Sequence, residues 1–295
     1  MITYNPKDWL RFIFSFHKSD TIRILFPGLI FIALFTWLVA YLELNYFQLS
    51  KNSSVANLTL MHSLLSFVIS MLLVFRTNTA YDRWWEGRKL WGSLVNNSRN
   101  FAIKLNGILP EEDTDNRNFF TRIIALYAAV LNDHLKSETT RLALDKQDHP
   151  ELNGIDKKKH LPNQVAALLF HRTNRLYTEQ KITGDQLIIL NTEIISFTDI
   201  CGACERIKNT PIPYSYSSFL KKFIFFFVIT LPFDLVFSLS YIAIPVVAFI
   251  FYVLASLELI AEEIEDPFGD DENDLPTDKI AANIKNHVTE ILQIN

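Results

Sequence analysis

The sequence contains only two cysteines and eight glycines among its 295 residues. Cys201 and Cys204 cannot build a disulfide framework, which fits a chain kept in reducing cytosol or in a membrane. With no second CxxC pair and no clustered histidines, the sequence predicts no zinc site. We interpret both cysteines as small packing residues of a helix.

The patterns that enzymes use are also missing. No glycine pair is spaced to cradle a phosphate, and neither a P-loop nor a G-x-S-x-G motif is present. Because no catalytic constellation stands out, we expect a protein that is not an enzyme. No small-residue cleavage site follows a short apolar core near the N-terminus, so we expect no removable signal peptide.

Apolar residues are abundant instead. Hydrophobic residues make up 49% of the chain, phenylalanine occurs 24 times, and the mean hydropathy is +0.14. This composition is too apolar for a typical enzyme of this length, yet with 20% charged residues it is too charged for a protein wholly inside lipid. It predicts an all-α protein with a membrane domain attached to an amphipathic helical part. The expected partners include membrane lipids and do not include nucleic acid.

Three apolar stretches lack Asp, Glu, Lys and Arg and approach the ~20 residues needed to cross a bilayer, namely 24–42, 58–75 and 235–257. A further span must begin near Ser215 and include Lys221 and Lys222 at its edge, where long cations reach the interface. Between residues 81 and 207 we find no continuous run long enough to cross lipid, only amphipathic helical patterns at 118–135 and 163–176.

Four spans give a simple organisation along the chain. We expect an interfacial N-terminal segment, the first two transmembrane helices, a cytosolic helical region, the third and fourth transmembrane helices, and an acidic C-terminal segment, at residues 1–23, 24–75, 76–214, 215–260 and 261–295. The first of these segments is equally compatible with a soluble helix packed on the next domain.

The distribution of cations predicts the topology. Four basic residues precede the first span and four follow the second, whereas Lys51 stands alone between them. The positive-inside rule therefore places both termini in the cytosol of a multi-pass protein of the inner (plasma) membrane.

A stripe on the second span is the candidate functional feature. Phe67, Met71 and Phe75 recur every four residues and share one face of a helix, with Ser66 and Ser70 on an adjacent strip. In a homo-oligomer each stripe residue becomes a ring, and apolar rings form a constriction that gates by dewetting. The alternative is an ordinary lipid-facing or core-facing surface.

Three ionisable side chains lie within or beside the spans. His62 falls inside the second span, where it is either a pH sensor or a neutral residue at the outer end of a helix. Glu43 and Asp234 either attract cations to a pore mouth or sit in headgroup water.

The run VFRTNTAYDRWWEGRKLWGSLVNNSRN at 74–100 resembles the signature of the bestrophin family of membrane channels. The segments NTPIPYSYS at 209–217 and EDPFGDDENDLP at 265–276 resemble two further motifs of that family, in the same order. The last of them has the form seen in prokaryotic members.

The resemblance implies a homopentamer around one axial pore, with four transmembrane helices per subunit continuous with a cytosolic helical bundle. It assigns the narrow neck to Phe67, Met71 and Phe75, the stripe described above. It also places a second, cytosolic aperture near Thr210, with Ile212 as its neighbour, so that this aperture has a polar lining.

Animal members of the family bind calcium in an acidic clasp. Matched to that motif, the carboxylates of Asp271 and Asp274 and the backbone carbonyls of Glu263 and Asp266 would hold Ca²⁺, together with a carbonyl from the N-terminal segment. Asn273 interrupts the run of acids here, and the alternative is a capping or inter-subunit turn without the ion.

The family resemblance implies passive conduction of small ions, with chloride or another anion favoured. Apolar rings carry no charge, so a monovalent-cation channel of the same family is an alternative. A membrane-anchored scaffold or assembly protein without conduction is a third possibility, for which the stripe would face lipid or the core of a monomer.

Overall fold

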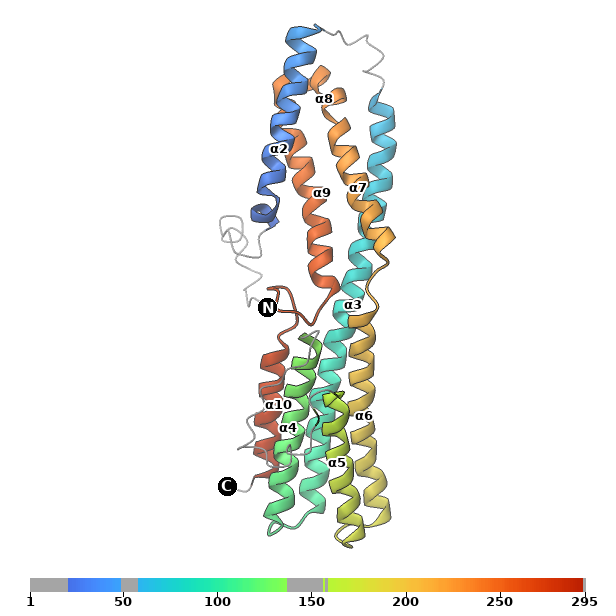
Figure 1. Cartoon of the computed structure of the whole chain (residues 1–295), viewed down its shortest axis with the longest axis vertical. Helices are drawn as coiled ribbons and strands as arrows, with labels where there is room; N and C mark the ends of the chain where they lie inside the picture. Colours follow the sequence, from blue (N-terminus) through green and yellow to red (C-terminus); the bar gives the residue numbers. More distant parts are fainter. Residues whose placement is uncertain (1–20, 49–57, 137–155, 157–158, 294–295) are drawn as a thin grey trace. The chain divides into compact units, whose positions relative to one another are not determined.

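The computed structural model describes residues 21–48, 58–136, 156 and 159–293. Within these residues every regular element is helical and no strand is present (Figure 1). The all-α prediction is therefore confirmed for the described part of the chain. Most of the expected interfacial segment 1–23 lies outside it. The chain divides into two compact units, which are described separately.

The first unit comprises residues 2–83 and 211–265. Its elements are α2 (Thr21–Tyr41) with a π-helical extension (Leu42–Tyr46), the beginning of α3 (Leu58–Ile108), α7 (Tyr214–Thr230), α8 (Pro232–Leu239), a 3-10 turn (Ser240–Ile242) and α9 (Ala243–Glu265). Helix α9 packs against α2 and α7. Its main cluster of buried apolar side chains is formed by Ile32, Ile69, Leu73, Leu220, Ile224, Phe227, Val228, Leu231 and Val247.

Two breaks separate the last three helices of this unit. Helix α7 ends at Thr230 and α8 starts at Pro232, because proline fits the first turn of a helix but not its interior. The second break is at Ser240, whose φ of 51° ends α8. The bend expected at the LPFD sequence is present. The last membrane-length helix, however, runs over Ala243–Glu265 and not over the uncharged run 235–257.

The second unit comprises residues 84–210 and 266–295. It contains the remainder of α3 together with α4 (Thr114–Lys136), α5 (Leu161–Thr178), α6 (Gly184–Asn209) and α10 (Thr277–Leu292). The amphipathic patterns predicted at 118–135 and 163–176 lie within α4 and α5, which confirms them. Helix α4 packs on α5 and α10, and α5 packs on α6, around one large apolar core.

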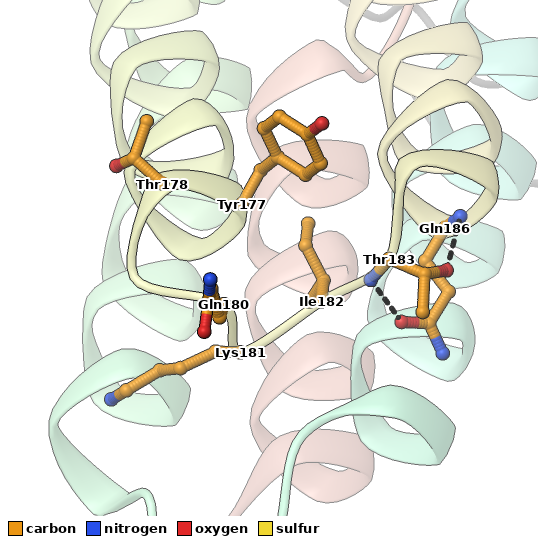
Figure 2. A pocket seen from close by; sticks show the side chains of 7 residues that line it. All are labelled: Tyr177, Thr178, Gln180, Lys181, Ile182, Thr183 and Gln186. Atoms are coloured by element: carbon orange, nitrogen blue, oxygen red, sulfur yellow. Dashed lines mark hydrogen bonds between the residues drawn. The ribbon is translucent and has the colours of Figure 1, made fainter.

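The start of α6 is fixed by a reciprocal cap. The backbone amide of Gln186 donates to Thr183 Oγ1, and the backbone amide of Thr183 donates to Gln186 Oε1 (Figure 2). The two bonds satisfy backbone donors that would otherwise be unpaired at the start of the helix. These residues belong to the short connection that joins α5 to α6. A shallow hollow is lined there by Tyr177, Thr178, Gln180, Lys181, Ile182, Thr183 and Gln186.

By length and composition, four helical stretches of the described chain are apolar enough to cross a membrane: Thr21–Tyr46, Thr59–Ile108, Gly184–Asn209 and Tyr214–Glu265. The prediction that no such stretch exists between residues 81 and 207 was therefore wrong for α6. Helix α6 differs from the other three in its packing, since 39% of its most apolar window is buried within the chain against 22% for each of the others. Its apolar residues largely serve the helical core.

Candidate functional site

Helix α3 presents the predicted stripe outward. Phe67, Met71 and Phe75 are 71%, 50% and 54% exposed, whereas Ile69 and Leu73 between them are almost fully buried in the core of the first unit. The stripe therefore does not pack within its own chain. Within one subunit it remains available to a pore, to lipid or to a neighbouring subunit.

The hydroxyl groups along this part of α3 are satisfied within the helix. Each donates to a backbone carbonyl four residues earlier, at 2.7–2.9 Å, in the case of Ser63, Ser66, Ser70, Thr77 and Thr79. A hydroxyl that bonds back to its own helix needs no water, so it can lie in an apolar environment.

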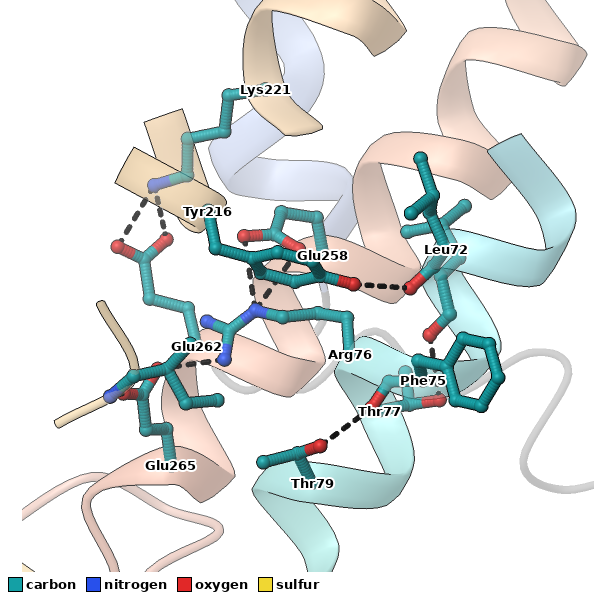
Figure 3. A network of polar contacts seen from close by, with 12 residues as sticks. Leu72, Phe75, Arg76, Thr77, Thr79, Tyr216, Lys221, Glu258, Glu262 and Glu265 are labelled. Carbon is teal, nitrogen blue, oxygen red and sulfur yellow. Dashed lines mark hydrogen bonds and ion pairs between the residues drawn. The ribbon is translucent and has the colours of Figure 1, made fainter. Parts of the chain in front are cut away.

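Directly below the stripe, Arg76 joins α3 to α9. The Arg76 side chain is 1% exposed, with Nε 3.3 Å from Glu258 Oε2 and Nη1 2.8 Å from Glu265 Oε2 (Figure 3). Glu258 is also nearly excluded from solvent. A charge buried to this extent is tolerated only when it is paired, so these three residues form one electrostatic unit.

Neighbouring contacts extend this network over the same region. Tyr216 Oη of α7 donates to the Leu72 carbonyl at 3.0 Å, and Lys221 of α7 pairs with Glu262 of α9 at 2.8 Å (Figure 3). Sequence reasoning identified Arg76 only as a cationic exit from the second span and did not find Glu258. The available signal was its position as the first charge after the uncharged run 235–257.

The two residues assigned to the cytosolic aperture lie in the short connection between α6 and α7. Thr210 caps the end of α6, and its hydroxyl bonds back to the Arg206 carbonyl. Ile212 is half-buried, and its amide donates to Glu265, which also binds Arg76. Thr210 and Ile212 belong to different compact units, each described by itself.

The acidic segment forms an ordered turn. Asp274 is 2% exposed, and its Oδ2 accepts a hydrogen bond from the Asp271 amide at 2.6 Å. Burial raises the pKa of Asp274 to about 7. The negative charges of Asp271 and Asp266 also raise this pKa, whereas the hydrogen bond from the Asp271 amide lowers it. The Trp84 indole donates to the Asn273 carbonyl at 3.1 Å. This hydrogen bond therefore connects the motif at 74–100 to the acidic motif at 265–276.

The side chains predicted to bind calcium have the chemistry that Ca²⁺ prefers. Asp274 Oδ1 is buried and has no hydrogen-bond partner among the described residues, and Asp271 is adjacent, as hard-oxygen binding of Ca²⁺ requires. However, Asp266, Asp271 and Asp274 do not bring three side-chain ligand atoms within 4.8 Å of one another in the described part of the chain. Glu263 lies in α9, within the other unit.

His62 is buried in the first unit, where its ring packs edge-on against Phe227. Its ring nitrogens lie 3.0 Å from Thr230 Oγ1 and 3.7 Å from Asp234 Oδ2, and Asp234 also accepts a bond from Thr59. Glu43 is buried as well. His62 and Asp234 are thus partners, whereas the sequence analysis treated them separately.

Among the described residues, the two cysteines and the hollow at the α5–α6 connection show no catalytic arrangement. Cys201 and Cys204 are free and buried in α6, which confirms their interpretation as packing residues. The hollow at the α5–α6 connection offers one ionisable amine, Lys181 (Figure 2). Lys181 is paired with Asp113 at 2.8 Å. Neither place has a nucleophile with an adjacent base.

An all-helical chain with several membrane-length apolar helices is a helical membrane protein. Residues 1–290 match the family model described as Bacterial/Fungal Bestrophin protein. The chain is 33% identical to the voltage-dependent anion channel-forming protein alr2987 of Nostoc sp., covering 100% of this chain and 95% of the relative. It is 31% identical to the voltage-dependent anion channel-forming protein YneE of Escherichia coli, covering 100% and 94%.

A mutant of a bacterial bestrophin homologue from Klebsiella pneumoniae has a similar solved structure. The TM-score is 0.81 at 26% sequence identity, with coverage of 91% of this chain and 98% of that one. The protein belongs to the bacterial and fungal bestrophin family, as its three motifs predicted. Its relatives are channel proteins and not enzymes.

Proposed function

We propose that this protein is a passive channel for chloride and other small anions, built from five copies around one axial pore. The observation that carries the proposal is the exposed stripe of Phe67, Met71 and Phe75 on a helix whose opposite face is buried. The chain matches anion channel-forming relatives over its full length, which is why we assign the stripe to a pore and not to lipid.

The stripe would act as the neck. Five copies of each residue would form three stacked apolar rings, and a narrow apolar ring expels water and so blocks ions until it widens. Met71 is unbranched and flexible, so the central ring would adjust more readily than the aromatic rings on either side. The buried contacts of Arg76 with Glu258 and Glu265 would hold α3 against α9 immediately below the neck.

We place the membrane around the first unit. Helices α2, the beginning of α3, α7 with α8, and α9 would make four crossings, with both termini in the cytosol of a cell whose inner (plasma) membrane holds the channel. Helix α6 is better buried within its own chain than the other long apolar helices, and we therefore assign it to the cytosolic bundle. Thr210 and Ile212 would line a second, cytosolic aperture.

Calcium binding is a separate proposal. The carboxylates of Asp271 and Asp274 would hold the ion, with backbone carbonyls of Glu263 and Asp266 and one from the N-terminal segment, which lies outside the described residues. Bound calcium would neutralise the buried Asp274 and stabilise the turn. Added Ca²⁺ should then raise the melting temperature of the wild type but not of Asp274→Asn. An equal change in the melting temperature of the two proteins would contradict calcium binding at Asp274.

Chloride efflux from liposomes tests the channel proposal. Purified oligomers, verified by gel filtration, are reconstituted in vesicles loaded with KCl, and external chloride is followed with an electrode. Addition of a potassium ionophore should start chloride efflux, because potassium then balances the charge. Efflux that matches protein-free vesicles would contradict an anion channel. If a proton ionophore instead released potassium from the same vesicles, a cation channel would replace it.

A further inference from the structure

The second unit brings two histidines and a glutamate together from three separate elements. His134 lies in the last turn of α4, His160 immediately precedes α5, and Glu205 lies near the end of α6. His134 Nε2 is 2.6 Å and His160 Nε2 is 2.5 Å from the same oxygen, Glu205 Oε1. The two imidazole rings are 4.6 Å apart between centroids. These residues are far apart along the chain, so they do not stand out as a histidine cluster in the sequence.

We propose that His134, His160 and Glu205 form a binding site for a divalent transition metal, with Zn²⁺ as the best match. Two imidazole nitrogens and one carboxylate oxygen are a recurrent zinc ligand set that leaves a coordination position for water. In the described part of the chain, these three residues are the group whose ligand atoms all lie within 4.8 Å of one another.

The geometry needs little adjustment to accept the ion. Ligand atoms about 2.0–2.2 Å from a tetrahedral zinc lie about 3.3–3.5 Å from one another, so each nitrogen must move by less than about 1 Å away from Glu205. The three side chains are 20%, 33% and 27% exposed, which leaves a path for the ion from solvent. Their backbones are held by helices that pack on one apolar core.

Metal binding would replace the hydrogen bonds of both rings to Glu205 Oε1 and would break one further hydrogen bond. His160 Nδ1 accepts a bond from the Asn163 amide at 3.2 Å, so in the neutral ring the proton is on Nε2 and faces Glu205. When the Nε2 lone pair binds the metal, that proton moves to Nδ1 and the Asn163 bond is lost. The Asn163 amide is at an exposed position, where water can replace the lost acceptor.

The ordinary alternative is a hydrogen-bonded cluster in which both rings donate to Glu205. Zinc binding distinguishes the two, because a cluster that is only hydrogen-bonded would not bind Zn²⁺ stoichiometrically. A site would instead tie the end of α4, the start of α5 and the end of α6 together, so metal should stabilise the bundle.

Zinc binding to the full-length oligomer tests the proposal independently of ion flux. The tag-free protein is treated with chelator, titrated with Zn²⁺ against a chromogenic competitor, and monitored by thermal melting. We expect one Zn²⁺ per chain and a higher melting temperature. Because loss of an outer-shell partner already costs about 10–100-fold in affinity, loss of a ligand should cost at least that much. The variants are His134→Gln, Glu205→Gln and His160→Asn, the last of which preserves a helix-capping side chain.

His171→Gln is the matched control, since His171 lies on α5 outside the cluster. It should bind zinc as the wild type does. X-ray absorption of the wild-type complex keeps the test valid even where a variant fails to fold. Nitrogen and oxygen neighbours at about 2.0–2.1 Å support the site, whereas a sulfur neighbour at about 2.3 Å would assign the metal to Cys201 or Cys204 and overturn it. Absence of stoichiometric binding, or equal affinity in all variants, would also overturn it.

Discussion

Arg76 and Glu258 are 182 residues apart in the sequence and form an ion pair that solvent scarcely reaches, with Arg76 Nε 3.3 Å from Glu258 Oε2. The pair joins α3 to α9 one residue below Phe75, the last member of the stripe. The pair therefore ties α3 to α9 next to the proposed neck.

Breaking this pair from one side should be costly. Arg76→Met leaves Glu258 buried without its cation, for which we expect a loss of about 3–5 kcal/mol in stability. Arg76→Met combined with Glu258→Met should recover most of the loss, because the double change leaves no buried charge at Glu258. Thermal melting in detergent measures both. A double variant no more stable than Arg76→Met would contradict the pairing.

A matched control lies in the same network. Lys221→Met removes the Lys221–Glu262 ion pair, whose side chains are 49% and 52% exposed. Exposed pairs contribute little, so we expect a change of less than about 1 kcal/mol. A loss as large as that of Arg76→Met would show that burial is not what makes the Arg76 contact important.

The acidic turn should not tolerate a side chain at position 269. A Cβ on Gly269 would lie 2.7 Å from Asp274 Oδ2, which is held in place by the Asp271 amide. We expect Gly269→Ala to cost about 1–3 kcal/mol through overpacking, measured by thermal melting. Gly202→Ala is the control, since its added Cβ meets nothing within 4 Å in the middle of α6. It should leave stability unchanged or raise it by up to about 1 kcal/mol.

The stability of the second unit should depend on pH through Asp113. Burial opposes ionisation of this carboxyl, but hydrogen bonds from Lys181 and Asn116 outweigh it and lower the pKa below 3.8. A lowered pKa contributes stability above the pKa of the unfolded chain and loses it as the pH falls through the folded value. Asp113→Asn should therefore be less stable than the wild type at pH 7, and the difference should shrink below pH 3.8. Unfolding curves of both proteins at pH 7 and below pH 3.8 would measure this difference in stability. A difference that stays the same at the two pH values would contradict the role assigned to the Asp113 carboxylate.

The neck assignment predicts a gain of function. Replacing Phe67, Met71 and Phe75 together with alanine should raise chloride flux, because wide rings no longer expel water. Phe226 and Phe249 are 63% and 64% exposed on α7 and α9, so their alanine variants control for the loss of exposed apolar surface. Unchanged chloride flux from correctly assembled stripe variants would show that the stripe does not line the pore.

Local periodicity predicted the amphipathic helices α4 and α5, and it grouped Phe67, Met71 and Phe75 on one face of α3 without deciding whether that face is buried. Ile69 and Leu73 alternate with the stripe at helical spacing, so burial of one face leaves the other exposed. The break at Ser240 could not be predicted in this way, because serine seldom adopts a positive φ and no glycine marks the position.

Contacts between distant segments were the second thing that local patterns did not reveal. Glu205 lies 71 residues from His134 and 45 from His160, and no motif spacing relates them. Glu258 likewise appears in the sequence as one acid among several after an apolar run. The partners of Glu205 and Glu258 depend on how the helices pack together. The periodicity within one helix carries no information about that packing.

The reversal potential of the purified oligomer in a planar bilayer under a KCl gradient tests the central claim most directly. An anion channel predicts reversal near the chloride equilibrium potential, with a shift when chloride is replaced on one side by a large anion. Reversal near the potassium equilibrium potential would contradict the account and make this protein a cation-conducting member of its family.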